Sequence, residues 1–286
     1  MRFTAPLALA AGLAAAWAAT PARAAGPGFE VLEPGLELAS FEGPTPEGEI
    51  TVARLDPYRF ELKLLAATMP GEGTLRSARA WAYRAGASAA INAAMYQEDH
   101  RTSVSLMRTR EHVNQRRVSK DKAFLAFDPV VSGVAPARIL DLECDPLTPS
   151  GEAYGALVQS IRLVSCHRRN VWAPSERRTS AAAIGVDGAG RLLFVHARTP
   201  WPVHELVNRL LALPIDLRQA MYVEGGPEAQ LFVRGGQREV ELTGTWESAP
   251  DVRLEGWPVP NVIVAVRRPA PLPRPPPPAV SAPRAR

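Results

Sequence analysis

Residues 222–232 read Tyr-Val-Glu-Gly-Gly-Pro-Glu-Ala-Gln-Leu-Phe. The apolar run from Ala220 to Val223 predicts a buried strand with Glu224 at its end. Gly225 and Gly226 allow a tight turn and a close approach of the backbone to a ligand, after which a second strand begins. Functional carboxylates are often carried on such connections, which makes Glu224 the first candidate for a site. The alternative is a β-turn whose glutamates are only solvated.

A second candidate segment is the mostly apolar run Ala-Ile-Asn-Ala-Ala-Met-Tyr at residues 90–96. It predicts a strand with the polar residue Asn92 at its end. Three further apolar segments follow: Ala-Ile-Gly-Val at 183–186, Leu-Phe-Val-His-Ala-Arg at 193–198 and Pro-Asn-Val-Ile at 260–263. In their order and spacing, these segments resemble the phosphodiester glycosidase family over roughly residues 85 to 266. Members of that family show Ile-Asn-Gly-Gly in the first segment and Asp-Gly-Gly in the segment that here contains Glu224.

The resemblance implies an exported bacterial hydrolase that cleaves a sugar-1-phosphate phosphodiester at the anomeric carbon. Because the leaving group is a phosphate monoester, a carboxylate facing the oxocarbenium-like centre and cations around the phosphate should carry most of the catalysis. The expected catalytic residues are Glu224 at the family's aspartate position, Arg198 as the phosphate ligand, and Glu228. The expected substrate-binding residues are Asn92, Gly225, Gly226, Arg101 and His196.

Each of these polar side chains also has a structural interpretation. Glu228 is alternatively a charge at the start of the outgoing strand, and Arg198 a solvated residue at a strand end. His196 is alternatively a histidine packed within its strand, and Asn92 the cap of a local turn. Arg101 belongs by default to a solvated loop.

The sequence departs from the family pattern at three places. Glu224 is one methylene longer than the family's aspartate, and Ala93-Ala94 replaces the glycine pair. Ala181 stands where the family has a second arginine, with Arg178 three residues earlier. These departures favour an alternative function, a catalytically inactive carbohydrate- or envelope-binding module of the same fold. Both functions predict a glycan or a sugar-phosphate as the partner.

Many short strands and two helices predict a mixed sheet and an α+β fold in a single large domain. The helices are expected from about Thr74 to Arg84 and from about Pro202 to Leu213. Alternating apolar residues over 50–55 and 60–66 predict a hairpin. The polar segment from Thr102 to Ser119 has no sustained period, which predicts a long surface excursion.

The two ends of the chain differ in composition from its centre. Residues 1–25 have a short basic start, an apolar run and a small-residue cleavage site, which predicts a signal peptide and export to the periplasm or the extracellular space. Residues 26–84 are expected to lead into the glycosidase-like domain at 85–268. The Pro- and Arg-rich residues 269–286 are expected to form a disordered tail. No stable membrane span is expected once the leader is cleaved.

The net charge of +4 comes from the two ends. They hold five arginines and no acidic residue, so residues 26–268 alone carry about −1. The basic pI of the whole chain therefore does not indicate a nucleic-acid partner.

The two cysteines, Cys144 and Cys166, predict one disulfide that closes a loop of about 20 residues in an exported chain. With only His167 adjacent, they do not make a convincing zinc site. His204-Glu205 lacks the second histidine of a His-Glu-x-x-His metal site. No cofactor or metal is therefore predicted, and a divalent metal is left as the alternative.

Overall fold

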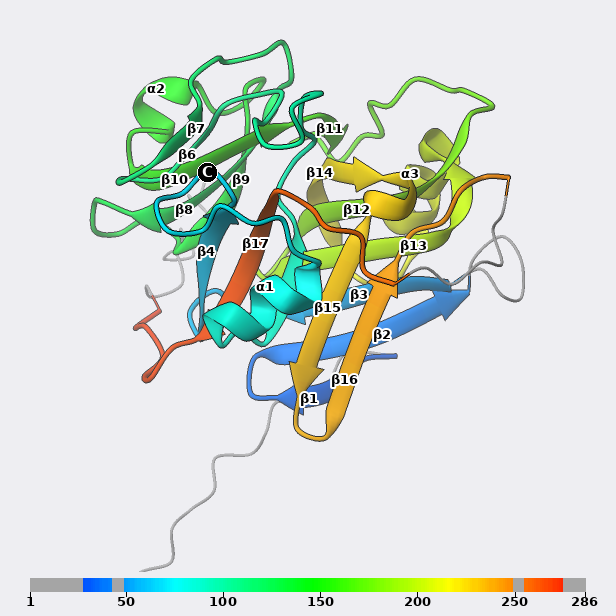
Figure 1. The fold of residues 1–286 in the computed structure, drawn as a ribbon, viewed down its shortest axis with the longest axis horizontal. Helices are drawn as coiled ribbons and strands as arrows, with labels where there is room; N and C mark the ends of the chain where they lie inside the picture. Colours follow the sequence, from blue (N-terminus) through cyan, green and yellow to red (C-terminus); the bar gives the residue numbers. More distant parts are fainter. Residues whose placement is uncertain (1–27, 43–48, 249–254, 275–286) are drawn as a thin grey trace, which may run out of the picture.

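Three antiparallel sheets carry most of the regular structure (Figure 1). The computed structural model describes residues 28–42, 49–248 and 255–274, so the predicted leader and residues 275–286 of the predicted tail lie outside it. Strands dominate, a few helices cover them, and the sheets share one core, which confirms the predicted α+β class and the single domain. None of the helices in the described ranges is long and apolar enough to cross a bilayer.

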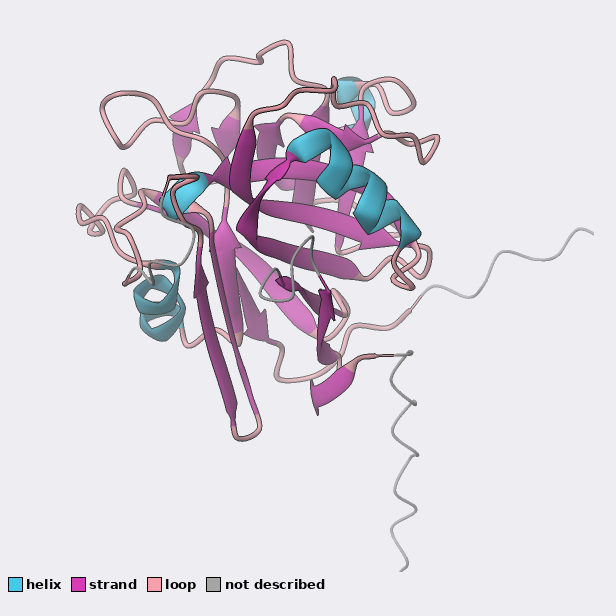
Figure 2. Cartoon of the chain, turned by 90° about the vertical axis from the view of Figure 1, so that its right-hand side faces the viewer, coloured by secondary structure: helices cyan, strands magenta, loops and turns pink. Residues whose placement is uncertain are grey.

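The largest sheet has seven strands and carries Glu224 near the end of one of them. In order across the sheet, the strands are β1 (Glu30–Glu33), β2 (Leu36–Glu42), β3 (Glu49–Leu55), β13 (Leu192–Pro202), β12 (Arg178–Asp187), β14 (Leu217–Gly225) and β11 (Arg162–Val164). Helix α3 (Val203–Ala212) covers one face of this sheet (Figure 2). Leu206 and Leu210, one turn apart, pack there against Ala183 and Val195.

A five-stranded sheet carries Asn92 at the end of one strand. Its order is β16 (Arg238–Thr243), β15 (Gln230–Gly235), β5 (Ala89–Asn92), β17 (Asn261–Arg267) and β4 (Phe60–Ala66). A short 3-10 turn, η1 (Gly226–Glu228), connects β14 to β15. Helix α1 (Ala78–Ala85) begins after Ser77, whose hydroxyl accepts a hydrogen bond from the Ala80 N–H (3.2 Å), and Trp81 packs it against this sheet.

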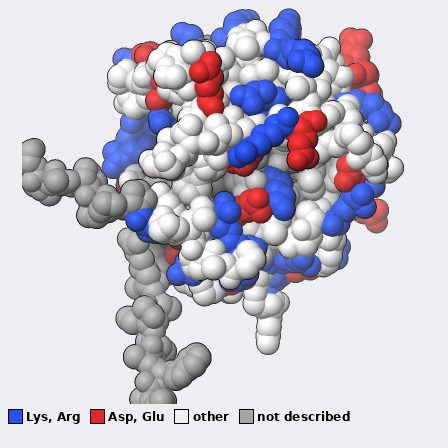
Figure 3. Space-filling view, turned by 90° about the vertical axis from the view of Figure 1, so that its left-hand side faces the viewer, with Lys and Arg blue, Asp and Glu red and all other residues white. Residues whose placement is uncertain are grey.

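The third sheet is also five-stranded. Its order is β7 (Val113–Gln115), β6 (Met107–Arg108), β10 (Tyr154–Ser160), β8 (Ala123–Pro129) and β9 (Ala137–Asp141), and the helical turn α2 (Leu147–Ser150) follows β9. On the side of the molecule that carries this sheet, Lys and Arg side chains are spread among acidic ones (Figure 3). The predicted disulfide is confirmed: Cys144 after β9 is bonded to Cys166 after β11, which links this sheet to the seven-stranded one.

One apolar core lies between the three sheets. Phe194 of β13, Ile91 of β5 and Leu125 of β8, one from each sheet, are fully buried in it. Strand β14 is fixed on both faces, because Val223 points into this core and Tyr222 into the apolar layer under α3. The burial of these apolar side chains holds the strand that ends at the glycine turn in one position.

The predicted hairpin over 50–55 and 60–66 is wrong. Strand β3 pairs with β2 and β13, whereas β4 pairs with β17 in a different sheet. The turn between them is held by the N–H groups of Arg59 and Phe60, which both donate to the Asp56 carbonyl oxygen (2.9 and 3.0 Å), and it passes the chain from one sheet to the other. Apolar alternation identifies a strand but not its partner.

Two segments predicted to be irregular contact the domain. Within the predicted excursion 102–119, strand β6 pairs with β10, and Ser105 and Met107 are buried. In the predicted tail, the Leu272 N–H donates to the Tyr58 carbonyl oxygen (2.8 Å). The start of the tail therefore lies against the turn that follows β3.

Candidate functional site

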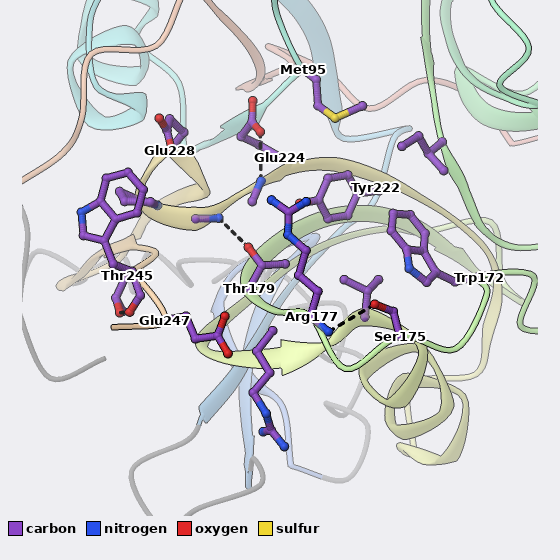
Figure 4. Close-up of a pocket in the computed structure, with 17 residues that line it drawn as sticks. Met95, Trp172, Ser175, Arg177, Thr179, Tyr222, Glu224, Glu228, Thr245 and Glu247 are labelled. Atoms are coloured by element: carbon purple, nitrogen blue, oxygen red, sulfur yellow. Dashed lines mark hydrogen bonds between the residues drawn. The ribbon is translucent and has the colours of Figure 1, made fainter. Parts of the chain in front are cut away.

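A cavity of about 610 Å³ opens beside the turn at Glu224 (Figure 4). Its walls include the ends of β12 and β14, the segment that precedes β12, and residues 245–247 after β16. The two predicted carboxylates, Glu224 and Glu228, both line it, as do Gly225 and Gly226. A cavity of this volume is large enough for a sugar-sized ligand.

The two glycines of the turn are required for different reasons. Gly225 has an extended backbone, but a Cβ there would overlap the Tyr222 hydroxyl oxygen and crowd Thr179 Oγ1. Gly226 has a φ of +65°, which favours glycine, and its N–H donates to Thr179 Oγ1 (3.0 Å). The turn is therefore packed directly against β12, and Glu224 is presented to the cavity from a fixed backbone.

Gly244, which follows β16, packs closely against the same glycine turn, and Gly244→Ala should disturb that turn. A Cβ at Gly244 would overlap the carbonyl oxygen of Gly226, so the backbone must move either at Gly244 or at the turn η1. We expect the free energy of unfolding to fall by about 1–3 kcal/mol, and any turnover in the cavity to fall as well. Denaturant unfolding and an activity assay measure the two effects.

The matched control for that substitution is Gly71→Ala. A Cβ at Gly71 meets nothing within 4 Å, and its φ of +79° costs only backbone strain. The control should lose stability without losing turnover per folded molecule. Unchanged turnover in Gly244→Ala would show that the position of the glycine turn does not matter to the site.

Glu224 is a carboxyl group in this cavity whose ionisation is strongly altered by the protein. The pKa of its carboxyl is raised to about 7, mainly by burial and to a smaller extent by the charge of Glu228, against the opposing hydrogen bond from the Gly225 N–H. That N–H donates to Glu224 Oε1 at 3.0 Å. A carboxyl with a pKa near neutrality can both donate and accept a proton under physiological conditions.

Two tyrosines lie within electrostatic reach of the carboxylates. The pKa of Tyr96 is raised to about 12, mainly by burial and then by the charges of Glu228 and Glu224. The pKa of Tyr222 is raised as well, first by burial and then by Glu224, while Arg177 opposes the shift. Both phenols therefore stay protonated and remain hydrogen-bond donors.

The cavity lining includes two arginines, one just before β12 and one at the first position of β12. Arg177 and Arg178 both line the cavity, and Arg177 extends its guanidinium toward Tyr222 (Figure 4). The main-chain N–H of Arg177 donates to Ser175 Oγ (3.2 Å), which fixes the segment locally. A guanidinium in this position suits a phosphate or carboxylate group of a ligand.

Sequence reasoning missed these two arginines as site residues, together with Trp172 and Trp246. The available signal was the run Ser-Glu-Arg-Arg-Thr-Ser at 175–180, directly before the central strand. Its meaning depends on an irregularity in the pairing of β12 with β13 between Thr179 and Ala181. Such a bulge changes which residue reaches the cavity, and sequence spacing alone does not reveal it.

Asn92 lies behind the cavity wall rather than in it. Its Nδ2 donates to the Glu228 carbonyl oxygen (2.8 Å), and its Oδ1 accepts from the Gln230 N–H (2.7 Å). The side chain is almost fully buried. Asn92 thus positions the backbone that carries Glu228.

Three further predicted residues lie outside the lining of this cavity. Arg198 is on β13, where its carbonyl oxygen accepts a hydrogen bond from the Ser180 hydroxyl. Arg101 is exposed in a loop, and its N–H donates to Asp99 Oδ1 (2.9 Å). His196 is 1 % exposed in the core, where its Nε2–H donates to the Ala229 carbonyl oxygen (3.2 Å).

Because His196 is buried, we expect the stability of the folded protein to decrease at acidic pH. Burial is the main cause that lowers the pKa of His196 to about 4, from 6.5. As the pH falls below 6.5, the unfolded chain binds a proton at this position while the folded protein does not, so the free energy of unfolding declines until about pH 4. His196→Gln should remove about 3 kcal/mol of that decline, as measured by urea unfolding at pH 7 and pH 4. An identical decline in both proteins would assign the acid sensitivity to other groups.

Potential metal ligands in the described ranges converge at Cys144, Cys166 and His167. The two sulfur atoms are bonded to each other, so this group offers no thiolate to a metal. The absence of a cofactor or metal remains a prediction.

Comparisons with known proteins show which family and which solved structures this chain resembles. A family model described as phosphodiester glycosidase matches residues 85–266. The catalytic domain of zebrafish N-acetylglucosamine-1-phosphodiester alpha-N-acetylglucosaminidase, auto-inhibited by its pro-peptide, is similar in structure, with a TM-score of 0.59 and 11% identity over 85% of this chain and 87% of that chain. A hypothetical protein from Synechocystis is similar with a TM-score of 0.53 and 14% identity, over 82% of this chain and 62% of that chain. No curated protein sequence matches. At these identities the solved structures show a shared fold.

Proposed function

Since this chain belongs to the phosphodiester glycosidase family, we propose that it hydrolyses a sugar-1-phosphate phosphodiester in the cavity beside Glu224. The observation that carries the proposal is the combination of groups in that cavity. A carboxyl with a pKa of about 7, Glu224, shares it with a second carboxylate, Glu228, and with the guanidinium of Arg177. Glycoside hydrolases usually act through two carboxyl groups on either side of the bond that breaks.

In the proposed reaction, Arg177 and Arg178 bind the phosphate and offset its negative charge. The bond between the anomeric carbon and the bridging oxygen breaks, and its electron pair leaves with the phosphate monoester. Glu224 in its acid form donates a proton to that oxygen, and the oxygen of a water molecule bonds to the anomeric carbon. Glu228 accepts the proton that this water loses and stabilises the oxocarbenium-like centre. Proton exchange with solvent then restores both carboxyl groups.

Two supporting roles follow from the same geometry. Asn92 fixes the backbone of Glu228 through its two hydrogen bonds, and thereby the direction of that carboxylate. The second role is that of Tyr96, whose protonated hydroxyl is within electrostatic reach of both glutamates although the residue does not line the cavity. The reaction as written uses no cofactor.

The second candidate function is glycan binding without turnover. It is favoured by two observations: both polar atoms of the Asn92 side chain are engaged by the main chain, and Arg198 lies outside the cavity lining. Two residues that were expected to contact substrate are then structural. In this case the cavity would hold a sugar-phosphate without cleaving it.

We also propose that the protein is exported. The disulfide between Cys144 and Cys166 supports a periplasmic or extracellular location, because such bonds persist in oxidising compartments. The predicted leader lies outside the described residues.

The test is an assay of the purified protein against diesters of N-acetylglucosamine 1-phosphate, glucose 1-phosphate and mannose 1-phosphate. Turnover should release free sugar and phosphate monoester in equal amounts. Tight binding of a sugar-phosphate with no release of either product would favour the second candidate. Neither binding nor release with any of them would overturn both.

A further inference from the structure

The cavity has one apolar wall that the proposed chemistry does not use. Met95, Ile161, Trp172, Val203 and Tyr222 all line it, and they belong to the apolar layer under α3. Figure 4 shows Met95, Tyr222 and Trp172 together on one side of the cavity. Met95, Ile161 and Trp172 are only partly buried, so apolar surface is left open to a ligand.

This wall is anchored in place before any ligand arrives. The Trp172 carbonyl oxygen accepts a hydrogen bond from His204 Nδ1 of α3 (2.6 Å), and the main-chain N–H of Trp172 donates to Asn170 Oδ1 (3.0 Å). Its ring contacts the Tyr222 ring, with centroids 5.4 Å apart. A preformed apolar surface binds apolar groups without an ordering cost.

The opposite wall carries polar and acidic side chains. Glu228, Thr245 and Glu247 lie on the other side of the cavity from Trp172, and the guanidinium of Arg177 lies between the two sides (Figure 4). A phosphodiester bound at Arg177 therefore has one ester arm toward the carboxylates and the other toward the apolar wall. The sugar belongs on the side of the carboxylates, because they must reach the anomeric carbon.

We propose, on the basis of the function proposed above, that the alcohol on the other arm of the phosphodiester is apolar. The substrate class is then a glycosyl phosphodiester of an alkyl or aryl alcohol, as in a glycolipid headgroup, rather than one joining two sugars. Each methylene of the alcohol that is buried against Trp172 and its neighbours should raise kcat/KM roughly fourfold. A short alkyl chain therefore suffices for a measurable preference.

The experiment compares octyl and glyceryl diesters of the three sugar 1-phosphates named above, below the critical micelle concentration. For a sugar that is turned over, kcat/KM of the octyl diester should exceed that of the glyceryl diester by at least about tenfold. Trp172→Ala should bring this ratio close to one, and Trp172→Phe should retain most of it. Trp257→Ala removes a half-exposed tryptophan that does not line the cavity, and it should leave the ratio unchanged.

The outcomes separate this inference from the function on which it rests. Equal kcat/KM for the two diesters in the unmodified protein, or a preference for the glyceryl diester, would overturn the apolar alcohol while leaving the hydrolase intact. A preference for octyl that survives Trp172→Ala would place the alcohol elsewhere and overturn the assignment to this wall. The absence of turnover with every diester would overturn both proposals.

Discussion

Glu224→Gln should lower kcat by about 10²- to 10⁴-fold, which is the usual contribution of a positioned general acid. The amide keeps the size of the side chain and can no longer donate an acidic proton to the bridging oxygen. KM should change little, because the phosphate is held by other groups. Steady-state kinetics on the best diester measures both parameters. Glu247→Gln alters an exposed carboxylate of the same cavity to which no proton transfer is assigned, and a similar loss there would indicate a general charge effect.

The pH profile should identify Glu224 as the acid. Its pKa of about 7 means that the acid form predominates below pH 7 and declines about tenfold with each pH unit above it. The kcat of the unmodified protein should therefore fall on the alkaline side of pH 7. In Glu224→Gln, the residual rate should lack this limb.

Stability supplies the control for correct folding of Glu224→Gln. The pKa of Glu224 is raised from 4.5 to about 7 in the folded state, mainly by burial, so ionisation of this carboxyl is disfavoured there. As the pH rises from about 4.5 to 7, the contribution of Glu224 to the free energy of unfolding is therefore lost. The glutamine variant should escape this loss and be more stable at pH 8 by up to about 3 kcal/mol. A variant that is both inactive and less stable would point to misfolding rather than to lost chemistry.

Arg177→Gln should lower kcat/KM by about 10- to 150-fold, which is the effect of losing one charge-assisted contact to phosphate. Inhibition by inorganic phosphate should weaken in parallel. Arg177→Lys keeps the charge without the planar fork, so it should restore part of the loss. Initial-rate kinetics with phosphate as a competitor measures the three proteins.

The matched control is Arg110→Gln, which removes an exposed arginine between β6 and β7, where it pairs with Asp128 of β8. This variant should behave like the unmodified protein. Equal kcat/KM in Arg177→Gln and Arg110→Gln would remove Arg177 from the phosphate site. It would also reopen the assignment of Arg198, the arginine first expected there.

The sequence predicted well those features that depend on local pattern. The strand that ends at Glu224, the glycine turn and helix α3 all follow from apolar periodicity and from residues with special backbone freedom. The candidate residues Glu224 and Glu228, chosen from this segment, are two of the three glutamates that line the cavity. In each case, the information lies in neighbouring residues.

Features that depend on packing between distant segments were not accessible in the same way. Strands β3 and β4 carry an ordinary alternating pattern, yet distant partners place them in different sheets. Arg177 lines the cavity just before a strand whose pairing is irregular, while Asn92 is turned to the backbone of the segment carrying Glu228. The pKa of Glu224 depends on its burial and on Glu228, which only the folded arrangement determines.

The most direct test of the central claim is which bond breaks. Hydrolysis of a glycosyl phosphodiester in water enriched in oxygen-18, followed by mass spectrometry of the two products, locates the oxygen that water supplies. Attack at the anomeric carbon predicts the label in the released sugar and none in the phosphate monoester. Label in the phosphate monoester would mean that water attacks phosphorus, and it would contradict the assignment of Glu224 and Glu228 to glycosidic cleavage.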